Sequence, residues 1–176
     1  MAVLQTPRLL LRPLVLEDAE PLQVVFGDPA VMQFGDGVRD LAWIREWIKT
    51  VIRTQYPIGL GVLAVTIIPD PIPIGFCGLS FYPSISPGGQ FEVGFRLGQH
   101  YWGQGYATEA ATAILRKTFT ETKIEKLVCL IDPNNWRSIR VAEKLGMSLE
   151  REVMLPGYTH PDILFAISRS QYLAQD

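Results

Sequence analysis

The sequence has few cysteines and histidines and no long apolar run. Cys77 and Cys129 are its only cysteines and have no C-x-x-C spacing, so we predict two buried free thiols and no disulfide framework. With His100 and His160 as the only histidines, a metal site is not predicted. No run reaches about 18 apolar residues, and the first residues lack a signal-like apolar stretch. We therefore expect a cytoplasmic protein with no membrane partner.

The sequence also lacks a basic surplus and the common nucleotide-binding loops. A formal net charge of −2, without a polybasic run, argues against a nucleic-acid partner. No G-x-x-x-x-G-K-[ST] loop occurs, and Thr108 stands where a G-x-G-x-x-G fingerprint needs its third glycine. What is present is a chain of 176 residues with 48% hydrophobic content. That length fits one core, so we predict a single domain over residues 1–176.

The stretch from Gln90 to Ala113 indicates a strand, a glycine-rich turn and a helix. Apolar residues alternate from Phe91 to Leu97, and after Gly103-Gln104-Gly105 they recur at helical spacing. A glycine-rich turn before a helix leaves backbone N–H groups unpaired beside the positive end of the helix dipole, which suits a phosphate or pyrophosphate. A tight turn that serves only close packing is the alternative.

The rest of the chain predicts strands and helices around this stretch. We expect helices from an Asp18 N-cap to Gly27, from an Asp40 N-cap to before Pro57, and from an Asn135 N-cap to Gly146, with a loop over residues 28–39. Further strands are expected at residues 8–13, 59–68, 74–81, 126–131, 147–154 and 162–168. The helical crossover between strands 91–97 and 126–131 implies parallel pairing. The predicted class is mixed α/β (α+β), with a central, mostly antiparallel sheet and helices on both faces.

Three separated motifs resemble the GNAT superfamily of acyl-CoA-dependent N-acetyltransferases. They are Glu92-Val93-Gly94-Phe95-Arg96-Leu97, then YWGQGYATEA from Tyr101 to Ala110, and then NWRS from Asn135 with EKLGM from Glu143. The W-G-x-G-Y-A-T-E-A form and TPRLLLRP, from Thr6 to Pro13, are similar to the Rim-type branch, named after ribosomal-protein N-terminal acetyltransferases. Trp102 departs from the Gln or Arg usual at its position, which leaves more of the binding to backbone amides.

The resemblance implies a single GNAT-like domain that uses acetyl-CoA. In that family two central parallel strands splay apart, the pantetheine arm bonds to the first strand, and the pyrophosphate lies on the amides of the glycine-rich turn. The cofactor-binding residues implied here are Phe95, Arg96, Leu97, Trp102, Gly103, Gln104, Gly105, Tyr106, Ala107, Thr108, Asn135 and Ser138.

Glu92 and Ser138 are the catalytic candidates. The resemblance suggests Glu92 as general base, although a structural carboxylate on the strand is an equal alternative, and Glu150 and Glu152 are the next candidates. Ala142 occupies the position of the tyrosine that is the general acid in many family members, so Ser138 becomes the candidate acid, unless it only bonds the helix backbone. Proximity alone can supply about 7 kcal/mol or more, so neither role is required.

The predicted function is transfer of an acetyl group to a primary amine, for example a peptide or protein N-terminus. The alternatives are a transferase for a polyamine or amino sugar, and a non-catalytic CoA-binding sensor. The acceptor would contact residues outside the turn, where core packing is the alternative for Trp43 and a solvated loop position for His160. These acceptor-binding candidates are Phe34, Trp43, Tyr82, Tyr158 and His160. The sequence leaves the acceptor's identity, the acyl length and the oligomeric state open.

Overall fold

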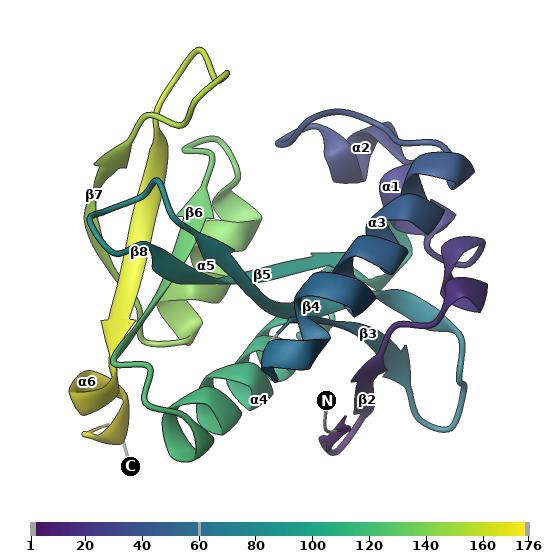
Figure 1. Cartoon of the computed structure of the whole chain (residues 1–176), viewed down its shortest axis with the longest axis horizontal. Helices are drawn as coiled ribbons and strands as arrows, with labels where there is room; N and C mark the ends of the chain where they lie inside the picture. Colours follow the sequence, from purple (N-terminus) through teal and green to yellow (C-terminus); the bar gives the residue numbers. More distant parts are fainter. Residues whose placement is uncertain (1–2, 60, 175–176) are drawn as a thin grey trace. The chain divides into compact units, whose positions relative to one another are not determined.

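The computed structural model describes residues 3–59 and 61–174, which fall into two compact units. Unit 1 comprises Met1–Leu79 and Gly94–Ala113, and unit 2 comprises Ser80–Val93 and Ile114–Asp176. The chain passes between the units within three continuous elements, β4, β5 and α4 (Figure 1).

The described residues contain eight strands, six α-helices and three short 3₁₀ turns. The strands are β1 Leu4–Gln5, β2 Leu9–Pro13, β3 Val62–Ile67, β4 Pro73–Tyr82, β5 Gln90–Leu97, β6 Lys126–Ile131, β7 Ser148–Val153 and β8 Asp162–Ser168. The helices are α1 Gln23–Phe26, α2 Pro29–Met32, α3 Leu41–Thr54, α4 Tyr106–Glu121, α5 Trp136–Lys144 and α6 Arg169–Leu173. The 3₁₀ turns are η1 Leu16–Ala19, η2 Tyr56–Ile58 and η3 Gln99–Tyr101.

The strands follow the order β1-β2-β3-β4-β5-β6-β8-β7 in a mixed sheet. The pairs β1–β2, β2–β3, β3–β4, β6–β8 and β7–β8 are antiparallel. β5 and β6 are parallel, with Phe91 opposite Leu127 and Glu92 opposite Val128. This confirms the predicted mixed sheet with a parallel pair.

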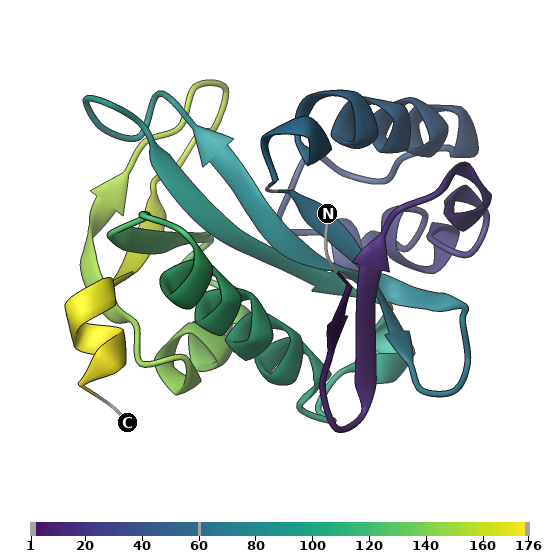
Figure 2. The same ribbon diagram turned by 60° about the horizontal axis from the view of Figure 1, so that its bottom comes forward.

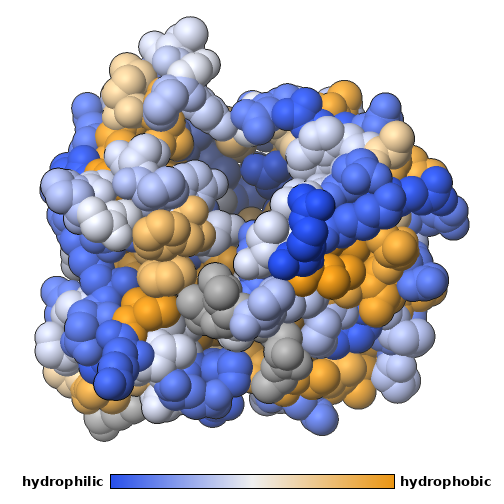
Figure 3. All heavy atoms as spheres, in the orientation of Figure 1, coloured by the Kyte–Doolittle hydropathy of each residue, from blue (hydrophilic) through white to orange (hydrophobic). Residues whose placement is uncertain are grey.

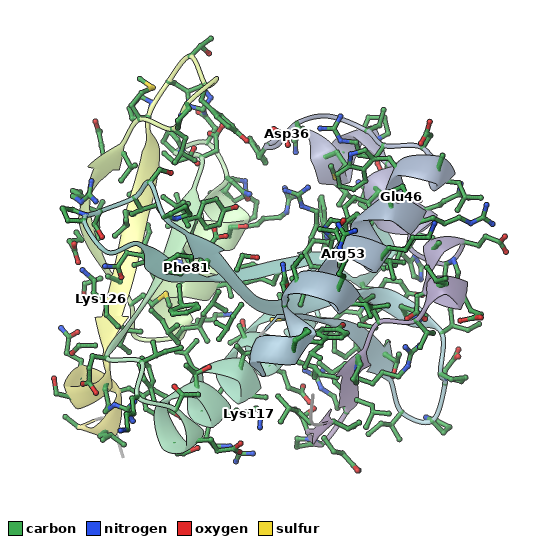
Figure 4. All side chains as sticks on the ribbon, viewed as in Figure 1. Asp36, Glu46, Arg53, Phe81, Lys117 and Lys126 are labelled. Atoms are coloured by element: carbon green, nitrogen blue, oxygen red, sulfur yellow. The ribbon has the colours of Figure 1, made fainter. Side chains whose placement is uncertain are left out.

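The core of unit 1 forms where α1 and α3 pack on one face of β3. Ile44, Ile48 and Val51 recur at helical spacing and are buried against Val62 and Ala64. The carboxylate of Asp40 accepts the Trp43 N–H at 2.8 Å, which confirms the predicted N-cap. Glu46 and Arg53 lie on the opposite, hydrophilic side of α3 (Figures 3 and 4).

Two predictions in unit 1 were wrong: the helix from Asp18 to Gly27 and the loop over residues 28–39. Asp18 does not cap a long helix: it is 3% exposed, lies inside η1 and binds the Arg12 guanidinium at 2.7 and 2.8 Å. Residues 28–39 are not all loop, because Asp28 accepts the Ala30 N–H and caps α2. The predicted helix from Asp18 to Gly27 is instead η1 followed by α1, and α2 lies within the predicted loop. Each of the three is about one turn long, too short to leave a periodic apolar pattern.

Unit 2 is built on three paired strands and the helix α5. β6 pairs with β8 from Lys126↔Ser168 to Ile131↔Ile163, and β8 pairs with β7. Gly146, with a φ of 75°, follows the end of α5, and the Met147 N–H bonds to the Ala142 carbonyl, as the sequence predicted for this C-terminus. Within the part of the chain that is described, no helix combines the length and apolar character needed to cross a membrane.

Candidate functional site

The glycine-rich turn in unit 1 has the backbone geometry of an anion site. Gly103 and Gly105 have φ values of 75° and 82°, which favour glycine. The first hydrogen bond of α4 runs from the Glu109 N–H to the Gly105 carbonyl. The amides from Gly105 to Thr108 therefore have no carbonyl partner within the helix. A Cβ placed on Gly103 would meet no atom within 4 Å, so a ligand could reach this main chain. These features fit a diphosphate.

Trp102 and Leu97, two of the proposed cofactor contacts, have partners within unit 1. The Trp102 amide donates to the Gln99 carbonyl at 3.1 Å, and its indole Nε1 donates to the Leu97 carbonyl at 2.8 Å. The Trp102 ring also packs against the apolar core. The donors available to an anion therefore start after Trp102, and the Leu97 carbonyl already accepts one hydrogen bond.

Glu109, in the first turn of α4, received no role from the sequence. Its Oε1 accepts from the Thr6 hydroxyl at 2.6 Å and the Arg8 amide at 3.0 Å, while its Oε2 accepts from Arg8 Nε at 2.6 Å. Burial alone would raise the pKa of this carboxyl, but the bonds from Thr6 and Arg8 outweigh burial and lower it. Arg8 lies in the TPRLLLRP motif and Glu109 in the YWGQGYATEA motif. In the sequence, only their opposite charges indicated that the two side chains could form an ion pair.

The lowered pKa of Glu109 predicts a loss of stability in acid. A carboxyl whose folded-state pKa lies below its unfolded value contributes stability above the unfolded value, about 4.3, and loses it as pH falls through the folded value. In urea unfolding between pH 6 and pH 3, the unfolding midpoint of Glu109→Gln should fall less than that of the wild type. Equal falls would contradict the prediction.

Glu92 lies on β5 at the last register pair with β6 in unit 2. Its Oε1 accepts the Leu130 N–H at 3.3 Å. If the parallel pairing of β5 with β6 continued, this amide could instead donate to a main-chain carbonyl of β5. Beyond this pair, the Cys129 thiol lies 3.2 Å from the Val93 carbonyl. The register between β5 and β6 thus ends at Glu92, which has a structural partner besides its predicted role as base.

Asn135 and Ser138 lie together at the start of α5 in unit 2. The Asn135 Oδ1 accepts the Ser138 N–H at 3.2 Å, which confirms the predicted N-cap. Ser138 is half-buried, and its role as general acid stays a prediction. Glu150 and Glu152, the other base candidates, are exposed on β7, and Glu150 forms an ion pair with Lys126.

Replacing Asn135 with alanine should cost about 1 kcal/mol of stability, because the helix loses its N-cap. Asp40→Ala removes an equivalent cap from α3 and is the matched control. If Asn135 also bonds the pantetheine arm, calorimetric titration should show weaker CoA binding for Asn135→Ala than for Asp40→Ala. Equal affinities would restrict Asn135 to capping.

Trp43, one of the acceptor candidates of unit 1, belongs to an aromatic cluster. Trp43 is 39% exposed, stacks with Trp47 at 6.4 Å between ring centroids, and contacts Phe26 at 5.4 Å. The Arg39 guanidinium lies over the Trp43 ring, 5.2 Å from its centroid. Phe34 is half-buried in the preceding loop. Trp43 therefore combines packing with an exposed face beside a cation.

The acceptor candidates of unit 2 differ in exposure. Tyr82 is half-buried and packs on the apolar cluster of unit 2, whereas Tyr158 and His160 are exposed between β7 and β8. His160 Nε2 lies 3.4 Å from an Asp132 oxygen. Burial and the neighbouring Asp132 raise the pKa of the Asp162 carboxyl, and His160 opposes this. His160 thus lies close to two carboxylates, Asp132 and Asp162.

Outside the turn, unit 1 has a further hollow among its described residues. This depression of about 480 Å³ is lined by Gln23, Val24, Gly27, Asp28, Gly98, Gln99, His100 and Tyr101. Over residues 3–59 and 61–174, no group of three or more His, Cys, Asp or Glu side chains could hold a metal ion. Cys77 and Cys129 are buried thiols that form no disulfide, as predicted, and burial raises the pKa of Cys77.

Comparison with known proteins shows similarity along nearly the whole chain. The family model described as "Acetyltransferase (GNAT) domain" matches residues 8–148. The Bacillus subtilis protein YkkB is 35% identical over 74% of this chain and 75% of its own. A crystal structure of a GNAT-family acetyltransferase from Bacillus anthracis has a TM-score of 0.83 and 26% identity, and covers 96% of this chain and 99% of that one. Escherichia coli spermidine N(1)-acetyltransferase is 34% identical over 45% of each chain.

Proposed function

Because the chain belongs to the GNAT acetyltransferase family, we propose that it binds acetyl-CoA at the turn from Gly103 to Thr108 and acetylates a primary amine by direct attack. The single observation that carries the coenzyme assignment is the turn itself. It combines two positive-φ glycines, open space at Gly103 and the first amides of a 16-residue helix. This is a binding surface for a diphosphate that needs no charged side chain.

Other residues would hold the rest of the coenzyme and the reacting groups. Phe95, Arg96 and Leu97 offer main-chain partners in unit 1, and Asn135 and Ser138 offer polar groups in unit 2. When bound, acetyl-CoA supplies a thioester whose thiol has an ordinary pKa of about 8.5, so a general acid helps the leaving group without being indispensable. Ser138 is the proposed proton donor.

The base requirement depends on the acceptor. At pH 7 the deprotonation of a lysine-like amine with a pKa of about 10.4 costs about 4.6 kcal/mol, whereas an α-amine near 8 costs about 1.4 kcal/mol. An α-amine therefore needs less help from Glu92, whose carboxylate accepts the Leu130 N–H, than a lysine-like amine does. That difference favours an acceptor with a low amine pKa.

We propose a peptide or protein N-terminus as the acceptor, in line with the Rim-type motifs. Arg39 lies over Trp43, one of the proposed acceptor residues, and is paired with Asp36 at 3.4 Å, so its charge does not by itself select a peptide over a polyamine. The partial similarity to spermidine N(1)-acetyltransferase supports the polyamine alternative, so both acceptors belong in the test.

Release of free CoA thiol tests the function directly. Acetyl-CoA is incubated with the protein and, in separate reactions, peptides with free α-amines, spermidine and an amino sugar, and thiol is followed with a chromogenic disulfide. Peptide-dependent release of thiol supports the proposal. Release with spermidine alone would show that the acceptor is a polyamine and not a peptide N-terminus. Tight CoA binding without release from any amine would identify a CoA-binding sensor, and no CoA binding would refute the coenzyme assignment.

A further inference from the structure

The turn between β1 and β2 lies against the start of α4 (Figure 2). Leu9 anchors this turn: it is fully buried in β2 and faces Ile67 of β3. The Leu9 N–H donates to the Thr6 hydroxyl at 2.9 Å, and the Thr6 amide donates to the Leu9 carbonyl at 2.9 Å. Thr6 and Arg8 are therefore held by a closed turn on a buried strand before they reach Glu109.

From this turn, the guanidinium of Arg8 contacts three residues around the glycine-rich loop. It binds the Glu109 carboxylate through Nε and Nη2, each at 2.6 Å, and Nη1 donates to the Gln104 carbonyl at 3.0 Å. Its Cζ also lies 4.6 Å from the centroid of the Tyr106 ring. One planar side chain thus connects the loop to the first turn of α4.

The bond to Gln104 fixes the direction of the next amide. In a planar trans peptide the C=O and N–H groups point in opposite directions. With the Gln104 carbonyl held toward Arg8, the Gly105 N–H must point away from Arg8. A donor bound to the carbonyl also polarises the peptide, so the N–H becomes a better donor to an anion.

We propose that Arg8 is a positioning residue for coenzyme binding, which with Thr6 and Glu109 holds the Gln104–Gly105 peptide in the orientation that presents its N–H to the diphosphate. This inference rests on the proposed function. The charge of Arg8 is compensated by Glu109, so the guanidinium acts through geometry more than through attraction. The Arg8 side chain is 47% exposed, so its ion pair should contribute little to the free energy of unfolding. We expect its main effect on the conformation of the loop.

The test compares Arg8→Ala with Arg12→Ala. Arg12 also binds a carboxylate through two nitrogens, at Asp18, but has no contact with the loop among the hydrogen bonds of the described residues. Calorimetric titration with CoA should give a dissociation constant raised roughly tenfold by Arg8→Ala, the effect of one lost charge-assisted hydrogen bond, and unchanged by Arg12→Ala. Pantetheine, which lacks the diphosphate, should bind the Arg8 variant and the wild type equally. In steady-state kinetics, KM for acetyl-CoA should rise while kcat changes little.

Two further measurements keep the inference falsifiable. Arg8→Lys retains the charge but not the planar fork, so it should restore less than half of the lost affinity on a logarithmic scale. Without any ligand, hydrogen exchange of the amides from Gly103 to Thr108 should be faster in Arg8→Ala than in Arg12→Ala. Equal CoA affinities for Arg8→Ala and wild type, or equal losses in both alanine variants, would overturn the positioning role. If the wild type fails to bind CoA, the proposed function falls, and the exchange rates still decide whether Arg8 orders the loop.

Discussion

Gly103→Val should weaken CoA binding by about a hundredfold or more, because the loop can no longer present its amides together. A β-branched residue at a φ of 75° is strained by about 1–2 kcal/mol, and the turn relieves this by changing its backbone conformation. Two lost hydrogen bonds to a charged group account for the expected change in affinity, roughly two orders of magnitude. Calorimetric titration with CoA measures it.

Gly59→Val is the matched control for Gly103→Val. Gly59 lies in the same unit with a φ of 74°, and a Cβ there also meets no atom within 4 Å. The urea midpoints of the two variants should fall by similar amounts, because the backbone strain and the space around the new side chain are alike at the two positions. If the two variants bind CoA equally well, the turn at Gly103 is not the coenzyme site.

Glu92→Gln should lower kcat/KM by about a hundredfold if Glu92 is the general base, and the loss in kcat should be greatest at low pH, where more of the amine is protonated. Glutamine keeps an oxygen that can accept the Leu130 N–H, so the variant removes the base while retaining the structural bond. The pH profile of thiol release, with a peptide acceptor, measures the effect between pH 6 and pH 9.

Glu152→Gln provides the comparison for Glu92→Gln. Glu152 is an exposed glutamate on β7 and was a weaker candidate for the same role. Its replacement should leave the rate unchanged. Full activity of Glu92→Gln across the pH range would assign Glu92 a structural role, and a loss confined to Glu152→Gln would move the base to β7.

Local sequence patterns predicted most of the strands and the longer helices. The alternation along β5 and the apolar runs of β6 and β8 gave those strands within one residue of their ends. The caps at Asp40 and Asn135 were also found, because a polar residue before a periodic apolar stripe is a local signal. Short elements such as α2 and β1 carry too few residues for a pattern.

Tertiary contacts decided what the local patterns could not. Asp18 resembles a helix cap in sequence, but in the fold its carboxylate is buried and binds the Arg12 guanidinium. Glu92 alternates like any strand residue, and only the meeting of β5 and β6 gives it the Leu130 amide. In both cases the partner lies outside the local segment or on another element.

The sequence by itself determined the family, the mixed sheet and the position of the glycine-rich turn, because motifs and periodicity depend on neighbours along the chain. Only the tertiary structure joined Thr6 and Arg8 to Glu109, about a hundred residues away, and showed that the Trp102 amide is already bonded. Hydrogen bonds between distant segments leave no periodic trace in a single sequence, since their geometry exists only after the strands and helices have packed.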